Sequence, residues 1–94
     1  MNKILTGGFT KIFKALGESS RQEIMSLLRT KGEMRVGDLV KELGLAQPTV
    51  SQHLRVLKEA GVLKSRRVGQ EMHYSVCSEK ICDVVSVFLK MYQR

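Results

Sequence analysis

The sequence predicts a mainly α fold with a small β-hairpin (α+β), in which about five helices and a two- to three-stranded sheet form one domain over residues 1–94. Three observations lead to this fold class. Within residues 36–61, apolar residues recur at helical spacing in two segments that a tight turn joins. After Gly61 the apolar period changes from 3.6 residues to 2, which indicates strands. Residues 81–92 return to helical spacing and are apolar on almost every side.

The first elements are placed by spacing and by helix-end signals. A short first helix is predicted from an apolar face at i, i+3, i+4 and i+7, made by Phe9, Ile12, Phe13 and Leu16. It ends at Gly17. The stretch from Ser20 to Glu23 has the pattern of a capping box and predicts the start of a second helix that closes at Gly32. Residues 33–35 are predicted to be extended and to form a small strand beside the hairpin.

Residues 36–61 predict a helix-turn-helix. The inward face of its first helix consists of Val36, Leu39, Val40 and Leu43. Gly44 marks the end of that helix, because glycine adopts the left-handed conformation without steric cost. Residues 45–47 make the turn, and Pro48 belongs in the first turn of the next helix, where its missing N–H has no partner to lose. The second helix ends at Gly61, and its inward residues are Val50, Leu54 and Leu57.

The outward face of the second helix suits a DNA groove lined by base edges and phosphates. An ordinary solvated helix face would carry more acids, whereas here no carboxylate precedes Glu59. The residues of this face all have polar side chains: Gln47, Thr49, Ser51, Gln52, Arg55 and Lys58. Between Arg55 and Arg67 the chain has five basic residues against one acid. This combination predicts a recognition helix followed by a basic patch.

Residues 63–67 and 71–76 predict a hairpin, which completes a winged helix-turn-helix. In the second strand Met72, Tyr74 and Val76 alternate with polar residues, as in a half-buried strand. The reversal is placed at residues 68–70, with Gly69 supplying a positive φ. The side chains expected at the tip of this wing, close to a minor groove or the DNA backbone, are Arg66, Arg67 and Gln70.

The last helix predicts a homodimer. Ser78 is the expected cap, and Glu79 is favourable in the first turn. One small domain can cover only one face of a helix that is apolar nearly all round, so a second copy of the chain is expected on the rest. Dimerisation is therefore predicted through residues 79–94 together with the first helix. The predicted interface residues are Ile81, Cys82, Val85, Phe88, Leu89 and Tyr92.

Composition narrows the class of protein. A net charge of +7 implies an anionic partner, and an apolar content of 43% rules out a disordered tail. No apolar run is long enough to span a membrane and the N-terminus lacks a signal-peptide core, so a cytoplasmic protein without a membrane partner is expected. The two histidines have no partners arranged for catalysis, and no glycine-rich phosphate loop is present. We therefore expect neither an enzyme nor a cofactor.

Residues 45–54 (LAQPTVSQHL), residues 13–17 (FKALG) and the basic stretch after Gly61 resemble the ArsR/SmtB family. The resemblance covers about residues 9–76 and implies a small bacterial winged-helix repressor that binds DNA. It does not extend to the metal sites of the family. Arsenic and cadmium sensors of the family carry a Cys-Val-Cys-Asp stretch where this chain has Arg35 to Asp38, and zinc sensors use acid and histidine pairs where the last helix offers Asp83 alone. No metal is therefore expected.

The predicted function is a homodimeric transcriptional repressor that binds an inverted-repeat operator in double-stranded DNA. The predicted DNA-binding residues are Gln47, Pro48, Thr49, Ser51, Gln52, His53, Arg55, Lys58, Lys64, Arg66, Arg67 and Gln70. Three alternatives remain. The repressor could respond to thiol chemistry through Cys77 and Cys82, although free cysteines are also ordinary small apolar residues. The winged helix could instead dock another protein, and RNA binding is a weaker option because no exposed aromatic platform is predicted.

Overall fold

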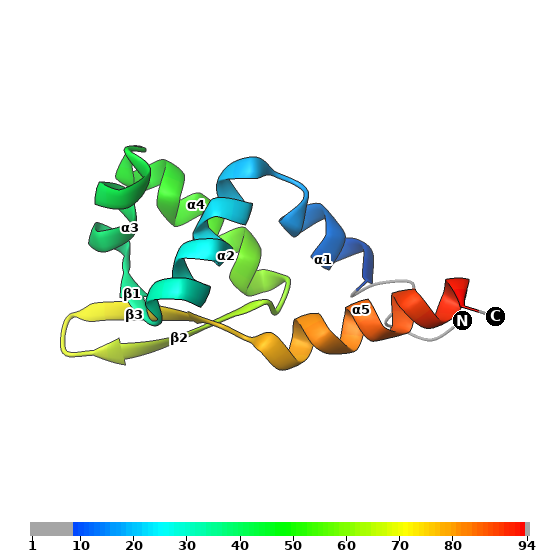
Figure 1. Cartoon of the computed structure of the whole chain (residues 1–94). Coiled ribbons are helices and arrows are strands. Elements are labelled where there is room, and N and C mark those ends of the chain that lie inside the picture. Colours follow the sequence, from blue (N-terminus) through cyan, green and yellow to red (C-terminus); the bar gives the residue numbers. More distant parts are fainter. Residues whose placement is uncertain (1–8, 94) are drawn as a thin grey trace.

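The structure is a computed structural model that describes residues 9–93; residues 1–8 and Arg94, which belong to the predicted domain 1–94, lie outside the described residues. Within the described part, the helices are α1 (Phe9–Leu16), α2 (Ser19–Lys31), α3 (Val36–Leu43), α4 (Gln47–Glu59) and α5 (Ser78–Tyr92). The strands are β1 (Met34–Arg35), β2 (Leu63–Val68) and β3 (Glu71–Val76). This element order, which Figure 1 shows, confirms the winged helix-turn-helix prediction.

The sheet is antiparallel and has the order β1-β3-β2, so the hairpin and the short strand join as predicted. The hairpin register runs from Leu63 opposite Val76 to Val68 opposite Glu71. Val68 is therefore the last residue of β2 rather than part of the turn, and the reversal is a two-residue turn in which Gly69 has a φ of +62°. The predicted alternation along β3 is wrong in part, because residues 72–76 are all half-buried. As the central strand, β3 has neighbours along both edges, and polar side chains cover its outer face.

A single core joins every helix to the base of the wing. The inward faces predicted for the helix-turn-helix are confirmed, with Leu39, Val50 and Leu54 fully buried. Val62 and Leu63, which lead into β2, are buried in the same cluster and fix the hairpin against the helices. α5 contributes the buried Val84 and the half-buried Ile81, whereas its C-terminal part continues past the helical body beside α1 (Figure 1). The molecule is consequently elongated, with extents of 46 × 25 × 22 Å.

Two predicted helix caps are wrong. α2 begins at Ser19, and its N-cap is Glu18, whose carboxylate accepts a hydrogen bond from the backbone N–H of Arg21 at 3.0 Å. Glu18, which precedes Ser19 and Ser20, thus supplies the acceptor for an N–H that has no partner within the helix. Ser20 lies inside the first turn instead of capping it. At α5 the N-cap is Cys77 rather than Ser78. The backbone N–H of Cys77 donates to the carbonyl of Val62 at 2.8 Å, so the end of the sheet fixes where the helix starts.

Candidate nucleic-acid interface

The turn between α3 and α4 is built from backbone geometry rather than from capping side chains. Gly44 adopts the left-handed conformation (φ 67°, ψ 23°), and its N–H donates to the carbonyl of Val40 at 2.9 Å. Ala46 is the N-cap of α4 and supplies no side-chain hydrogen bond, and Pro48 lies in the first turn. Gln47, predicted in the turn, is the first residue of the helix. The N-terminal amides of α4 therefore remain available to an anion such as a DNA phosphate.

α4 presents the predicted polar face to solvent. Exposed side chains cover its N-terminal and outer surface: Gln47, Pro48, Thr49, Ser51, Gln52, Arg55 and Lys58. Arg55 donates from Nη2 to the side-chain carbonyl of Gln52 at 2.6 Å. This bond orients the amide of Gln52 and leaves its two N–H donors directed away from the arginine. The arrangement pairs a group that can contact base edges with a cation that can contact phosphate.

His53 differs from its neighbours in this set. Its side chain is only 15% exposed, and its Nδ1 lies 3.7 Å from Glu18 Oε2 and 3.3 Å from Arg21 Nη1. Both partners belong to the start of α2. The ring therefore faces the start of α2 rather than the outer face of α4, as its position beside the apolar stripe allows. Its inclusion among the DNA-binding residues stays a prediction.

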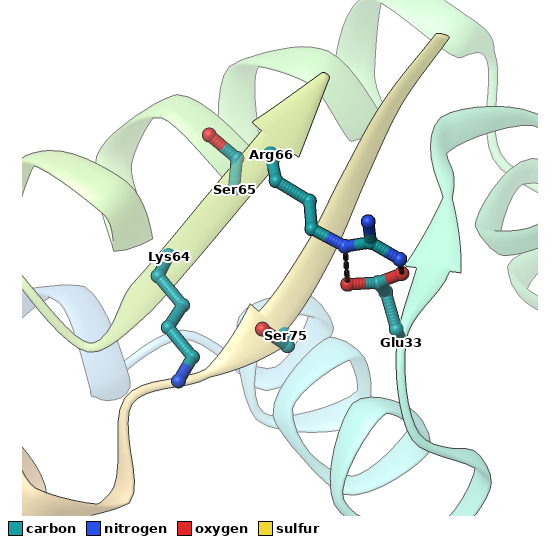
Figure 2. Close-up of a pocket in the computed structure, with 5 residues that line it drawn as sticks. All are labelled: Glu33, Lys64, Ser65, Arg66 and Ser75. Atoms are coloured by element: carbon teal, nitrogen blue, oxygen red, sulfur yellow. Dashed lines mark hydrogen bonds and ion pairs between the residues drawn. The ribbon is translucent and has the colours of Figure 1, made fainter. Parts of the chain in front are cut away.

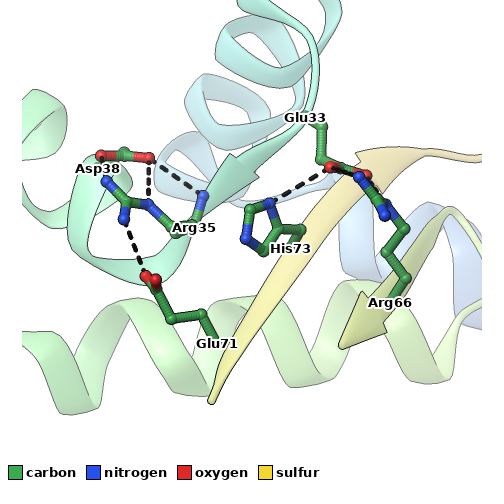
Figure 3. A network of polar contacts seen from close by, with 6 residues as sticks. All are labelled: Glu33, Arg35, Asp38, Arg66, Glu71 and His73. Carbon is green, nitrogen blue, oxygen red and sulfur yellow. Dashed lines mark hydrogen bonds and ion pairs between the residues drawn. The ribbon is translucent and has the colours of Figure 1, made fainter. Parts of the chain in front are cut away.

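The wing separates its two arginines. Arg67 and Gln70 are exposed close to the turn, as predicted. Arg66 is placed opposite His73, inside the hairpin, and its guanidinium donates two hydrogen bonds of 2.8 Å to the carboxylate of Glu33 (Figure 3). Arg66 therefore does not join a cluster at the tip, because Glu33 holds it. The hydrogen bonds from Arg66 lower the pKa of Glu33, and the same pair raises the pKa of Arg66.

A second ion-pair group connects the wing to α3. Arg35 donates to both carboxylate oxygens of Asp38 at 3.2 Å and to Glu71 at 2.9 Å, and Asp38 also accepts from the backbone N–H of Arg35 at 3.3 Å. Asp38 thus caps α3 in place of the serine or threonine that a helix start normally uses. Figure 3 shows this group beside the Glu33–Arg66 pair on the same side of the sheet. Sequence reasoning missed both groups. Arg35 and Asp38 are a local i, i+3 pair, whereas Glu71 and the Glu33–Arg66 pair are distant in the chain and come together only in the folded domain.

An open depression of about 420 Å³ lies on the outer face of the sheet. It is lined by Glu33, Lys64, Ser65, Arg66 and Ser75 (Figure 2). Lys64 is opposite Ser75 at the base of the hairpin, so it is separated from the turn by most of the strand. Glu33 and Arg66 are paired with each other, so Lys64 supplies the remaining charge of the lining.

Apolar side chains remain uncovered where α5 and α1 meet. Phe88 lies between the two helices, with its ring centroid 5.4 Å from Phe9, 5.3 Å from Phe13 and 5.1 Å from Tyr92. The large side chains left exposed around it are Phe13 (40%), Val85 (41%), Leu89 (52%), Met91 (51%) and Tyr92 (73%). We call these residues, with Phe88, the α1/α5 apolar face. Of the predicted interface residues, Ile81 instead packs on the core, and Cys82 is exposed.

The cysteines and the other side chains that could bind a metal do not form a cluster in the described part of the chain. Cys77 is half-buried at the start of α5, and both cysteines are free thiols. Among residues 9–93, no three His, Cys, Asp or Glu side chains lie together in an arrangement that could hold a metal ion. In the same part of the chain, no helix combines the length and apolarity needed to cross a membrane.

Several known proteins are similar to this chain in sequence and in fold. Residues 18–65 match the profile described as "Bacterial regulatory protein, arsR family". An uncharacterized HTH-type transcriptional regulator of Methanocaldococcus jannaschii is 36% identical over 77 residues, which cover 82% of this chain and 86% of the relative. The transcriptional repressor SdpR of Bacillus subtilis is 31% identical over 83 residues, covering 88% of this chain and 91% of the repressor. The solved structure of HlyU from Vibrio cholerae has a TM-score of 0.75 at 27% identity and covers 98% of both chains.

The matched segment begins at Glu18, the N-cap of α2, and runs through the helix-turn-helix into β2. It therefore contains α4, the turn that precedes it and the first three residues of β2, in the order that the structure shows. The family consists of transcriptional regulators that bind DNA, and its members are not enzymes. With a profile match over half of its length and full-domain relatives above 30% identity, this chain belongs to the arsR family of bacterial regulatory proteins.

Proposed function

We propose that the protein is a homodimeric transcriptional repressor that binds an inverted-repeat operator in double-stranded DNA. Each protomer inserts α4 into a major groove, and the wing lies against the adjacent backbone or minor groove. Two copies join through the α1/α5 apolar face, which places two recognition helices on one side of the dimer. The protein acts where the chromosome lies, in the cytoplasm.

The observation that carries the proposal is the exposed face of α4. Seven exposed residues of this helix are polar, basic or proline, and its acid, Glu59, is the last residue of the helix. Repression, rather than activation, is supported by relatives such as SdpR, which is a transcriptional repressor. A net charge of +7 supplies the non-specific attraction to phosphates on which sequence reading is superimposed.

Electrophoretic mobility shifts test DNA binding directly. The protein should shift random double-stranded DNA at low salt, and the shift should weaken steeply as salt rises, because binding releases counterions from the phosphates. A winged helix that docks another protein should leave the duplex unshifted, and an RNA-binding protein should prefer a single-stranded RNA competitor. Either of these results would contradict the proposal.

Glu33 is expected to limit the contribution of Arg66 to DNA binding. The lowered pKa of Glu33 keeps this carboxylate ionised and paired with Arg66 through the neutral pH range. Glu33→Gln should free the guanidinium for phosphate, raise affinity for every duplex and steepen the salt dependence by about one ion. Titrations at several salt concentrations measure both quantities.

The matched control is Glu23→Gln, which removes the same charge from an exposed position on α2. It should raise affinity less, since it changes the net charge without releasing an arginine. The higher affinity of Glu33→Gln relative to wild type should also vanish at a pH below the lowered pKa of Glu33, because protonation of Glu33 then breaks the pair with Arg66 in wild type as well. Equal effects of the two substitutions at neutral pH would contradict the role given to Glu33.

The operator complex is expected to be indifferent to arsenite, cadmium and zinc. Arg35 and Gly37 offer no thiolate at the start of α3, and Asp83 is a single carboxylate on α5. Tight binding of these metals needs several oriented thiolate or imidazole ligands. Each metal is titrated into a preformed protein–DNA complex with reductant present. Release of DNA by one equivalent per protomer, lost in a Cys77→Ser Cys82→Ser variant, would show that the cysteines form a metal site.

A further inference from the structure

One guanidinium connects the end of α1 to the recognition helix. Arg21, in the first turn of α2, donates from Nε to the carbonyl of Ala15 at 2.6 Å and from Nη2 to the carbonyl of Lys14 at 3.3 Å. Its Nη1 lies 3.3 Å from Nδ1 of His53, which is 32 positions away in the chain. The side chain is half-buried between the three helices. Arg21 therefore contacts α1 and α4 at the same time.

The contacts of Arg21 with α1 and with His53 have different effects. The last carbonyls of a helix have no partner within the helix, and a charged donor satisfies them at the end of α1. Arginine has five donors in a rigid planar fork, so fixing two of them on α1 also fixes the direction of the third. That third donor meets His53. A lysine at this position could not hold all three acceptors with one defined orientation.

The contact requires one tautomer of the ring. A guanidinium only donates, so a hydrogen bond from Arg21 needs the lone pair of His53 Nδ1, which is free in the tautomer that carries its proton on Nε2. Glu18 closes the group, because its carboxylate accepts from the backbone N–H of Arg21 at 3.0 Å and lies 3.7 Å from His53 Nδ1. A hydrogen bond from the backbone of Ser20 is the largest influence that lowers the pKa of Glu18, so this carboxylate is ionised.

The two helices joined in this way have different tasks in the proposed function. α1 carries Phe9 and Phe13, whose rings pack against Phe88 of α5 in the α1/α5 apolar face. α4 carries Gln52, which directly precedes His53 and faces outward. The orientation of α1 is set by the dimer, and the orientation of α4 decides which base edges the protein can reach.

We propose that Arg21 is a positioning residue for DNA reading: by holding the last turn of α1 and Nδ1 of His53 together, it sets the orientation of the recognition helix relative to the dimer. Arg21 touches no DNA in this arrangement. The inference rests on the proposed function, because its effect is on operator affinity. It adds a residue that neither the exposed face of α4 nor the wing includes.

Nitrogen NMR of the His53 ring tests the contact in the free protein, without DNA. At a pH where the ring is neutral, wild type should show a single tautomer with the proton on Nε2. Arg21→Met, which keeps the length of the side chain and removes its donors, should lose this preference. A mixture of tautomers in wild type, or an unchanged tautomer in Arg21→Met, would overturn the inference.

Operator affinity tests the consequence. Arg21→Met should weaken binding about tenfold, as expected for a lost hydrogen bond to a charged group. His53→Leu removes the acceptor at similar volume and should cause a similar loss, whereas His53→Gln keeps an acceptor and should bind nearly as well as wild type. The Arg21→Met His53→Leu variant should lose no more than either single change, because both remove the same contact. Additive losses, or equal binding by the leucine and glutamine variants, would overturn the inference.

Controls separate this role from charge and from folding. Arg29→Met removes the same charge from an exposed position in the last turn of α2 and should change affinity far less than Arg21→Met. If Arg21→Met fails to fold, the comparison of His53→Leu with His53→Gln still decides the question. Failure of wild type to bind any duplex would reject the proposed function itself. Binding by wild type that Arg21→Met and His53→Leu leave unchanged would reject the role of Arg21 alone.

Discussion

Replacing Val85 and Leu89 by glutamate is expected to convert the protein into monomers and to abolish specific DNA binding. Both side chains are large, apolar and about half exposed in a single protomer. In the proposed dimer they are buried, so the variant places two carboxylates from each protomer in an apolar interface. A dimer with a micromolar dissociation constant is held by about 8 kcal/mol. Unpaired buried charges cost several kcal/mol each, so four of them are enough to prevent association.

Sedimentation velocity at micromolar concentration measures the effect, together with operator binding. The matched control is Ser86→Glu Lys90→Gln, which also lowers the charge by two but on exposed residues of the opposite side of α5. This control should remain dimeric and lose only the part of the affinity that depends on overall charge. A monomeric wild type, or a glutamate variant that stays dimeric, would contradict the assignment of the α1/α5 apolar face.

Gln52→Ala and Arg67→Ala are expected to damage DNA binding in different ways. An amide paired with an adenine edge contributes about 1–3 kcal/mol of discrimination, so Gln52→Ala should lose operator affinity while random DNA is bound almost as before. Arg67→Ala should weaken binding to all sequences and lower the salt slope by about one. Arg67 is chosen over Arg66 because Glu33 already holds the Arg66 guanidinium.

Competition between operator and random duplexes at several salt concentrations separates the two effects. Arg29→Ala, at an exposed position in the last turn of α2, controls for the loss of one positive charge outside α4 and the wing. A loss of specificity in Arg67→Ala with a uniform loss in Gln52→Ala would contradict the roles given to the two residues.

Most of the fold could be predicted because its strongest signals are local. The apolar period of 3.6 placed the inward faces of α3 and α4, and the change to a period of 2 placed the wing. Gly44 and Gly69 marked reversals that need a positive φ, and the structure has both in that conformation. The helix caps were less certain from sequence, because Ser20 and Glu18 could both satisfy the first amides of α2. The path of the chain after Leu16 makes Glu18 the N-cap, with its carboxylate accepting from the backbone N–H of Arg21.

The polar contacts of the candidate site could not be predicted in the same way. The Arg66–Glu33 and Arg21–His53 contacts join residues 33 and 32 positions apart. They depend on strand register and on the crossing of α2 with α4, which composition and spacing do not contain. Both contacts change the interpretation of residues that looked like simple DNA ligands. Arg66 is paired with Glu33, and His53 contacts Arg21 and Glu18 at the start of α2.

Selection of bound fragments from the source genome, followed by footprinting of one of them, tests whether the dimer binds a specific operator. The selected fragments should share an inverted repeat, with half-sites about one helical turn apart and one dimer protecting both. Gln52→Ala should reduce the enrichment of these fragments, and the Val85→Glu Leu89→Glu variant should abolish it. Recovery of fragments with no shared sequence, or a footprint over a single half-site by a monomer, would rule out a homodimeric repressor with an inverted-repeat operator.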